Sequence, residues 1–223
     1  MTLSASARKF SRNLDGIVEL ARQHDSLELL RAMISDEFDP LTRLNNRQTF
    51  DERIRRVTER ASRQLRAADG HGAAGACFAL VDIDHFKKVN DRFGHLYGDE
   101  VLTLLARLME PTFRHEDILF RYGGEEFAVV PARADLQVAA GALERFRASI
   151  EAYAFPQIGR KTVSIGFTAL GAEPGVEKAV ACADKALYYA KNHGRNRVAC
   201  YETLVTNGKL EAVALTKGDI ELF

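Results

Sequence analysis

The sequence predicts an α/β protein of the α+β type, with a mixed central β-sheet of about five strands flanked by helices. One observation is a continuous apolar run at residues 77–81 (CFALV), typical of a central strand covered on both faces. Two further runs, residues 118–120 and 127–130, flank a pair of glycines and predict a hairpin. Such runs alternate irregularly with amphipathic stretches of helix length, which favours a mixed sheet over an all-parallel one.

The composition is that of a globular chain. Of its 223 residues, 46% are hydrophobic and 28% are charged, which argues against wholesale disorder. No apolar stretch approaches the roughly 18 residues of a membrane span, and residues 1–16 lack the apolar region of a secretory signal. The 31 Lys and Arg balance the 31 Asp and Glu, so net charge gives no reason to expect nucleic acid as a partner. Three widely spaced cysteines without a CxxC pair favour reduced, cytoplasmic residence.

The first predicted element is a helix over residues 3–38, whose apolar positions recur at heptad-like steps with a break near residues 24–26. It is either a helix packed on its own domain or a short dimerising coiled coil, because the repeat is too short to decide. Asp39 ends it, since the residue before Pro40 is disfavoured in the α region. A helix follows over residues 47–68, and its interleaved arginines and acids are typical of a solvated face.

The elements after the central strand begin with a short helix and a glycine-punctuated loop over residues 85–98. Asp99 is expected to cap the N-terminus of the next helix, because its short carboxylate can accept from free backbone N–H groups. After the predicted hairpin, residues 135–150 have the spacing of an amphipathic helix. Residues 162–167 (TVSIGF) then read as another strand.

The last elements are a helix and a hairpin. Residues 176–192 are predicted to be helical and to stop at Gly194, which takes the position just after the helix C-cap. Residues 198–205 and 209–215 read as two strands joined by Asn-Gly at residues 207–208. Asn-Gly is the strongest two-residue signal for a hairpin, so a terminal hairpin is expected there.

Acidic side chains follow the central strand. Asp82 and Asp84 alternate at its end, so their side chains are expected on one face of the sheet and that of Ile83 on the other. Carboxylates at the end of a buried strand are costly unless they are paired or bind a metal. Oxygen ligands of this kind suit Mg²⁺ or Mn²⁺. The alternative for Asp84 is a structural role as a helix N-cap.

The hairpin tip carries the second group of polar residues, RYGGEEF at residues 121–127. Gly123 and Gly124 allow positive φ and let the backbone approach a ligand closely, and exposed N–H groups there can cradle phosphate. The alternative is a plain type I′ turn on which Glu125 and Glu126 are merely solvated.

Together these features resemble the GGDEF diguanylate cyclase family, in the GGEEF form of its signature. The resemblance spans about residues 39–201 in family order and spacing, which makes it highly specific. One departure is Arg43, where the family usually has glycine, a change expected to alter the loop near the guanine pocket. The matching blocks are DPLTRLNNR at 39–47, DIDHFKKVNDRFGHLYGD at 82–99, RYGGEEF at 121–127, TVSIG at 162–166 and ADKALYYAKNHGRN at 183–196.

The resemblance implies a fold like that of nucleotidyl cyclases and polymerase palms. It divides the chain into an N-terminal helical segment for signalling or dimerisation (1–38), a GGDEF domain (39–201) and a C-terminal tail with the possible hairpin (202–223). The family normally carries a sensor upstream, and none is visible here. We therefore expect either a fragment of a longer sensor protein or a small stand-alone cyclase.

The activity implied is condensation of two GTP into cyclic di-GMP with release of two pyrophosphates. The 3′-hydroxyl of one GTP attacks the α-phosphate of the other, and such chemistry depends on positioning and charge neutralisation. Because one subunit holds one substrate, the resemblance implies a two-fold homodimer.

The resemblance also implies which residues carry the reaction. Asp82, the carbonyl of Ile83 and Glu125 are expected to bind Mg²⁺ (or Mn²⁺), and Glu126 to add a carboxylate. Glu125 is further expected to help deprotonate the attacking hydroxyl. The backbone of residues 123–124 would meet the phosphates.

Nucleotide recognition is implied for another set of residues. Asn90 and Asp99 match the guanine readers, since a carboxylate can accept from the N1–H and N2–H₂ groups of guanine, which adenine lacks. Lys87, Lys191 and Arg195 match the triphosphate clamp, and Lys87 counts with Asp82 and Glu125 among the expected catalytic residues. Outside these motifs such cations would be ordinary surface charge.

An inhibitory product site is implied by an RxxD pair, Arg114 and Asp117, because five residues (118–122) separate Asp117 from Gly123, which is the family's spacing. Arginine can stack on guanine and donate to it in a fork, and aspartate can accept from it. Arg145 falls where relatives carry a second arginine for this site. Without the family spacing, the pair would be read as a surface salt bridge.

Two other functions remain open from the residues. One is a receptor that binds cyclic di-GMP through Arg114 and Asp117 without turnover. The other is a generic nucleotide cyclase or polymerase-palm enzyme, for which paired acids on a strand and a hairpin are also suitable. The intact signature favours turnover, and the pair Asn90 and Asp99 favours GTP.

Overall fold

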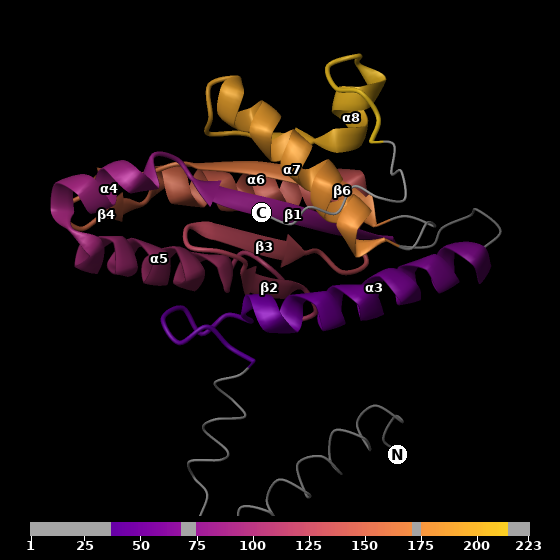
Figure 1. The fold of residues 1–223 in the computed structure, drawn as a ribbon, viewed down its shortest axis with the longest axis horizontal. Helices are drawn as coiled ribbons and strands as arrows, with labels where there is room; N and C mark the ends of the chain where they lie inside the picture. Colours follow the sequence, from indigo (N-terminus) through magenta and orange to yellow (C-terminus); the bar gives the residue numbers. More distant parts are fainter. Residues whose placement is uncertain (1–36, 68–74, 171–174, 214–223) are drawn as a thin grey trace, which may run out of the picture.

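The computed structural model describes residues 37–67, 75–170 and 175–213, with side chains of residues 61–67 left aside (Figure 1). Its centre is a five-stranded sheet with the order β2-β3-β1-β6-β7. Only the β6–β7 pair is parallel among these strands, which confirms the predicted mixed sheet. The strands are β1 Ala76–Ile83, β2 Ile118–Arg121, β3 Glu126–Val130, β6 Val163–Leu170 and β7 Val198–Cys200, and a separate ribbon pairs β4 Ala154–Phe155 with β5 Gly159–Arg160.

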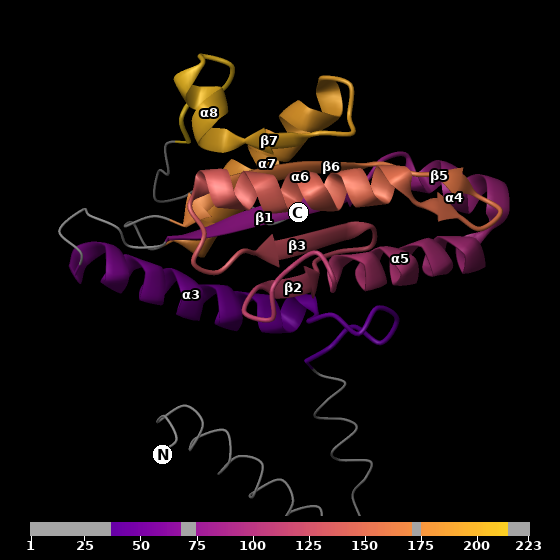
Figure 2. The ribbon, with the colours of Figure 1, turned by 180° about the vertical axis from the view of Figure 1, so that it is seen from behind.

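Helices cover both faces of the sheet. Residues of α5 and α6 pack in one hydrophobic cluster with one face, and residues of α3 and α7 pack in another cluster with the opposite face. Accordingly, α7 lies in front of the sheet in Figure 1 and α6 lies in front of it in Figure 2. The helices are α3 Arg47–Ala67, α4 Phe86–Phe93, α5 His95–Met109, α6 Leu136–Ala152, α7 Val176–Asn192 and α8 Tyr201–Thr206.

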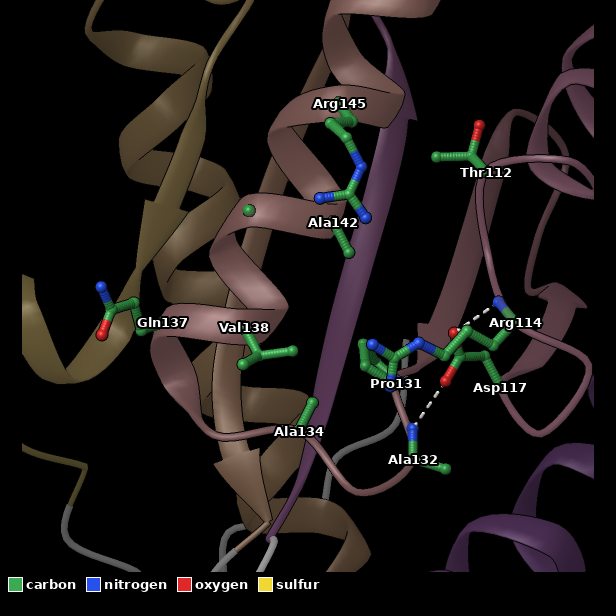
Figure 3. A pocket seen from close by; sticks show the side chains of 11 residues that line it. Thr112, Arg114, Asp117, Pro131, Ala132, Ala134, Gln137, Val138, Ala142 and Arg145 are labelled. Carbon is green, nitrogen blue, oxygen red and sulfur yellow. Dashed lines mark hydrogen bonds between the residues drawn. The ribbon is translucent and has the colours of Figure 1, made fainter.

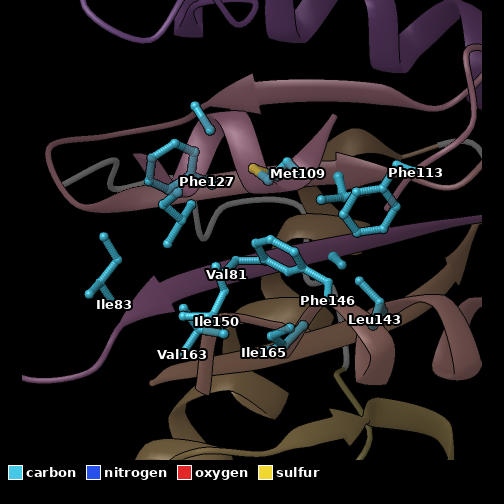
Figure 4. Close-up of a cluster of buried hydrophobic side chains, with 14 of the residues drawn as sticks. Val81, Ile83, Met109, Phe113, Phe127, Leu143, Phe146, Ile150, Val163 and Ile165 are labelled. Carbon is cyan, nitrogen blue, oxygen red and sulfur yellow. The ribbon is translucent and has the colours of Figure 1, made fainter. Parts of the chain in front are cut away.

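Strand β1 is central, as its apolar run predicts, and every one of its residues is buried. Val81 and Ile83 face the α5–α6 side, where Phe127 and Phe146 join them in the core (Figure 4). Each fully buried side chain of this kind contributes about 1.5–3 kcal/mol through the hydrophobic effect. The end of this strand is therefore held rigidly, and with it the acids that follow.

The predicted cap at Asp99 is wrong. Helix α5 begins earlier, at His95, directly after Gly94, which turns the chain between α4 and α5 with a φ of 89°. Gly98 lies inside α5 and is buried. A Cβ there would stand 2.0 Å from Oδ1 of Asn90, so the close packing requires glycine. The glycine that seemed to punctuate a loop instead allows two helices to pack closely, and Asp99 lies within the helix.

The predicted terminal hairpin is also wrong. After the short β7 the chain forms α8, because Tyr201 and Leu204 are buried against α7. Residues 207–208 end this helix, with Gly208 at a φ of 64° and Lys209 N–H donating to the Leu204 carbonyl at 2.8 Å. Tertiary packing therefore overrides the local Asn-Gly signal.

Two predictions fall on parts of the chain outside the described residues. The helix expected over residues 3–38 lies almost wholly in residues 1–36, and the end of the tail comprises residues 214–223. Within the described ranges, no helix combines the length and apolar character that crossing a bilayer requires.

Candidate active site

Asp82 ends the buried face of β1 that looks toward α7. Its carboxylate is only 5% exposed and pairs with the ammonium of Lys191 on α7, with Oδ2 and Nζ 2.7 Å apart. Burial raises the pKa of Asp82 above its usual value, and the charge of Asp84 acts in the same direction. Lys191 and the charge of Arg195 oppose this rise, which places both cations within electrostatic reach of Asp82.

Glu125 and Glu126 join Asp82 in an acidic cluster. Asp82 of β1 lies directly opposite Glu126 of β3 in the sheet register, and like charges in such a position repel each other. Burial raises the pKa of both glutamates, the charge of Asp82 raises it further, and Lys191 lowers it. We call Asp82, Glu125 and Glu126 the acidic cluster, and Lys191 pairs with it through Asp82.

The glycines of the hairpin tip do not adopt the predicted conformation. Neither Gly123 nor Gly124 has a positive φ, which excludes the type I′ turn and corrects the expectation that the pair serves such angles. A Cβ at Gly123 would stand 2.9 Å from Oε2 of Glu126, whereas the space around Gly124 is open to beyond 4 Å. Gly123 therefore lets the Glu126 carboxylate lie against the backbone, and Gly124 leaves room beside the acidic cluster.

Arg121 anchors this tip to the first described residues. Its guanidinium donates to both carboxylate oxygens of Asp39, at 3.1 and 3.0 Å, and to the Gly124 carbonyl at 3.0 Å. Burial alone would raise the pKa of Asp39, but hydrogen bonds from Thr42 and Arg121 hold it below its usual value. Sequence reasoning missed this contact, although both residues lie in matching blocks.

The opening block bends sharply beside the tip. Arg43, at the position where the family usually has glycine, adopts a φ of 64°, and its N–H donates to the Asp39 carbonyl at 2.9 Å. An arginine in this left-handed region costs about 1–2 kcal/mol relative to glycine. A second cation, Arg47, stacks 3.8 Å over the ring of Tyr122.

The segment after α7 carries Arg195, whose charge acts on Asp82. Gly194 ends the helix with a φ of 105°, as predicted, and Arg195 N–H donates to the Ala190 carbonyl at 3.0 Å. Lys87, by contrast, is exposed in the first turn of α4, and none of the hydrogen bonds or ion pairs found within the described residues ties it to the cluster.

Asp84 does not cap a helix. The N-cap position of α4 is His85, which makes no capping hydrogen bond, and the expected alternative for Asp84 is therefore wrong. Its carboxylate accepts from Oγ1 of Thr162 at 2.6 Å, from Oγ of Ser164 at 2.7 Å and from the backbone N–H of Asn196 at 3.0 Å. Asp84 thus joins β1, β6 and the segment after α7.

The expected guanine readers lie on the packed pair α4 and α5. Asn90 has a buried Oδ1 that finds no hydrogen-bond partner in the described part of the chain. Asp99 is exposed on α5, next to the Gly98 that admits the Asn90 amide. A buried amide oxygen without a donor is costly, and this one packs against Gly98 of α5.

The RxxD pair and Arg145 line one pocket of about 250 Å³. Figure 3 shows Arg145 reaching from α6 toward the side of the pocket on which Arg114 and Asp117 lie. The Asp117 carboxylate is fixed by two backbone donors, Arg114 N–H and Ala132 N–H, both at 2.8 Å. The structure therefore brings the three predicted residues together, and it uses Asp117 to order the loop that presents Arg114.

Comparison with known proteins shows which family this chain resembles. The family described as Diguanylate cyclase, GGDEF domain, matches residues 36–197. The diguanylate cyclase DgcP of Pseudomonas aeruginosa is 40% identical over 163 residues, covering 72% of this chain and 23% of DgcP. DgcM of Escherichia coli is 39% identical over 160 residues, covering 72% of this chain and 37% of DgcM.

Among solved structures, one contains the coiled coil and GGDEF domain of DgcB from Caulobacter crescentus in complex with c-di-GMP. It superimposes with a TM-score of 0.71 at 32% identity and covers 85% of this chain and 97% of that chain. The present chain spans well under half the length of the two named full-length relatives. With its signature, fold and carboxylate arrangement, the chain belongs to the GGDEF diguanylate cyclase family.

Proposed function

We propose that this protein condenses two GTP molecules into cyclic di-GMP and releases two pyrophosphates. The observation that carries the proposal is the acidic cluster, which lies beside the open space at Gly124. Clustered carboxylates, a nearby lysine and accessible backbone are the groups that phosphoryl transfer needs for positioning and charge neutralisation. The named relatives, which are diguanylate cyclases, support the same reaction.

The acidic cluster supplies the oxygen donors that divalent metals take, although in the described ranges no three Asp, Glu, His or Cys side chains are already gathered around a metal position. We assign Asp82, Glu125, Glu126 and the carbonyl of Ile83 to Mg²⁺ or Mn²⁺, since these hard cations prefer oxygen ligands. After burial, the charge of Asp82 is the main cause that raises the pKa of both glutamates, and a bound cation relieves this repulsion. When bound, the metal would polarise phosphate oxygens and make the attacking hydroxyl more acidic.

Glu125 is the group best suited to receive the proton of the attacking 3′-hydroxyl. Burial and the charge of Asp82 raise its pKa above the usual value of 4.5, toward the range in which a carboxylate is an effective general base. Because Lys191 lowers the same pKa, release of Lys191 from Asp82 toward a phosphate would strengthen Glu125 as a base.

The remaining residues are assigned to the nucleotide. The Asn90 amide and the Asp99 carboxylate recognise the guanine edge. Lys87, Lys191 and Arg195 neutralise the triphosphate, with the backbone N–H groups of residues 123–124. The half-buried Asn90 and the exposed Asp99 lie on the packed pair α4 and α5, which supports this assignment.

The working state we propose is a two-fold homodimer, since each acidic cluster serves one nucleotide and the reaction joins two. Residues 39–201 form the cyclase domain, and residues 1–38 supply dimerisation or signalling. The DgcB structure, which combines a coiled coil with its GGDEF domain, supports that division. A cytoplasmic location suits the GTP substrate and the free cysteines at positions 77, 182 and 200.

We also propose product inhibition through the pocket of Arg114, Asp117 and Arg145. Two arginines and an acceptor that share one pocket of about 250 Å³ can stack on guanine and pair with its edges. The pocket is also compatible with the alternative of a receptor without turnover, because binding of cyclic di-GMP there does not require the acidic cluster.

The test of the proposal is turnover of GTP by the purified protein with Mg²⁺, with the product identified by mass spectrometry. We expect cyclic di-GMP from GTP and none from ATP alone. Glu125→Gln should abolish the product while the unfolding midpoint stays within a few degrees of the wild-type value. Binding of cyclic di-GMP without any turnover, at every protein concentration, would establish the receptor alternative instead.

A further inference from the structure

The segment between α7 and β7 holds a backbone conformation that its own residues disfavour. Arg195 and Asn196 follow Gly194 with φ values of 60° and 45°, so three consecutive residues lie at positive φ. Non-glycine residues reach this region only at a cost, and they stay there when surrounding contacts fix them. The contacts that fix this segment therefore determine where the Arg195 side chain can go.

Asn196 is fixed at three points. Its backbone N–H donates to Oδ2 of Asp84 at 3.0 Å, and its side-chain Nδ2 donates to Oε1 of Glu151 at 2.7 Å. Its Oδ1 accepts from Nη1 of Arg147 at 2.6 Å. Both Arg147 and Glu151 belong to α6, which covers the face of the sheet opposite to α7. A helix from the other side of the sheet therefore holds Asn196 in place.

The holding residues are themselves ordered. Arg147 donates to Oε1 of Glu144 through Nε and Nη2, at 2.8 and 2.7 Å, and to Oε2 of Glu151 at 2.7 Å. Its side chain is only 12% exposed. Asp84 is held by hydroxyl groups of Thr162 and Ser164 on and beside β6. We call Arg147, Glu151, Asn196 and Asp84 the Asn196 clamp.

Arg195 lies between two fixed points as a result. The end of α7 holds its N–H on one side, and the clamp holds Asn196 on the other. The charge of Arg195 reaches Asp82, two residues before Asp84 on the same strand end. One strand end thus carries both the acidic cluster and the anchor of the neighbouring cation.

We propose that Asn196 is a positioning residue that, held by Arg147 and Glu151 of α6, aims Arg195 at the phosphates of the bound nucleotide. The proposal rests on the proposed function, because it presumes a nucleoside triphosphate at the acidic cluster. Since none of the clamp residues is among the groups assigned to the nucleotide, their effect on it passes through Arg195.

The first measurement is calorimetric binding of 3′-deoxy-GTP with Mg²⁺, a probe that lacks the attacking hydroxyl, compared with GMP. Asn196→Gly removes the clamped side chain and at the same time relieves the positive φ, so the variant should fold. We expect the Kd for 3′-deoxy-GTP to rise about tenfold and the Kd for GMP to change less than about twofold. Arg147→Ala should do the same, whereas the matched control Arg107→Ala, at an exposed arginine of α5, should do neither.

The deciding measurement is a double-mutant cycle with Arg195→Ala. If Asn196 acts through Arg195, the tenfold effect of Asn196→Gly should shrink to less than about twofold in the Arg195→Ala background. An effect of equal size in both backgrounds would overturn the proposal, and so would an equal loss of 3′-deoxy-GTP and GMP binding. A protein that binds 3′-deoxy-GTP but makes no cyclic di-GMP from GTP would contradict the proposed function alone.

Discussion

Two glycine-bearing turns border the acidic cluster, and protein contacts hold them in opposite ways. The tip at residues 123–124 has no positive φ, and no atom lies within 4 Å of the position that a Cβ of Gly124 would take. The turn at residues 194–196 has three consecutive positive φ values and is fixed by α7, by Asp84 and by α6. The first turn leaves room for a ligand, and the second is fully determined before any ligand binds.

The difference shows that one site can combine a turn with room for a ligand and a turn that protein contacts hold in one conformation. The acidic cluster carries repulsion that the described protein leaves only partly compensated by Lys191, so a bound cation can still improve its electrostatics. The Asn196 clamp has its hydrogen-bonding groups paired, so a ligand can gain little by rearranging it. Substitutions in the two turns should therefore affect different quantities.

The largest expected effect is on activity, from Asp82→Asn in the acidic cluster. We expect loss of cyclic di-GMP formation by at least about a hundredfold, because the variant removes charge that positions the metal and the phosphates. The unfolding midpoint should hardly change, since the same substitution removes the repulsion with Glu126 while it unpairs Lys191. Initial rates measure the loss of activity, and thermal unfolding of the same preparation measures the midpoint. A large fall in the midpoint would contradict the statement on stability, and a near-normal rate would contradict the statement on activity.

The next effect is on stability, from Gly166→Ala in β6. A Cβ at Gly166 would stand 2.1 Å from the Leu187 nitrogen and 2.3 Å from the Ala183 carbonyl oxygen, both backbone atoms of α7. We expect the free energy of unfolding to fall by about 3 kcal/mol, because α7 must move outward. Urea unfolding measures this change in the free energy of unfolding. Gly175→Ala is the control, since its Cβ meets Lys178 at an ordinary 3.5 Å.

A paired substitution separates the two turns directly. Gly194→Ala should lower the free energy of unfolding by about 1–2 kcal/mol, because a φ of 105° is strained for alanine. Gly124→Ala should change it by less than about 0.5 kcal/mol, since the site is open and φ is ordinary. Gly124→Ala should instead slow turnover at least about tenfold by displacing the phosphates. The reverse pattern, with Gly124→Ala the less stable variant, would contradict this contrast.

The smallest effect is a pH dependence of stability from the acidic cluster. The folded-state pKa values of Glu125 and Glu126 lie above the usual 4.5, so the folded protein binds more protons than the unfolded chain in the window above pH 4.5. Stability from these groups is therefore lost as the pH rises through that window. Between pH 4 and 8, the midpoint of thermal unfolding should fall less for Glu126→Gln than for the wild type. An unchanged decline would mean that Glu126 is not part of the shared repulsion.

Local patterns predicted the regular elements of the fold well, because apolar periodicity reports directly which faces are buried. The run at residues 77–81 predicted the central strand, and the runs around residues 123–124 predicted the β2–β3 hairpin. The same patterns failed where a tertiary contact competes with a local signal. Asn-Gly at residues 207–208 ends a helix, since burial of Tyr201 against α7 outweighs the preference for a hairpin turn.

The sequence by itself determined the family and the main strands and helices of the sheet and its layers, because these follow from residue types at fixed local spacings. Only the tertiary structure decided that Arg121 ties Asp39 to the signature tip and that Asp84 anchors Asn196. These partners are 82 and 112 residues apart in the chain. Contacts at such separations depend on how the sheet pairs and how the helices pack, which no local pattern records.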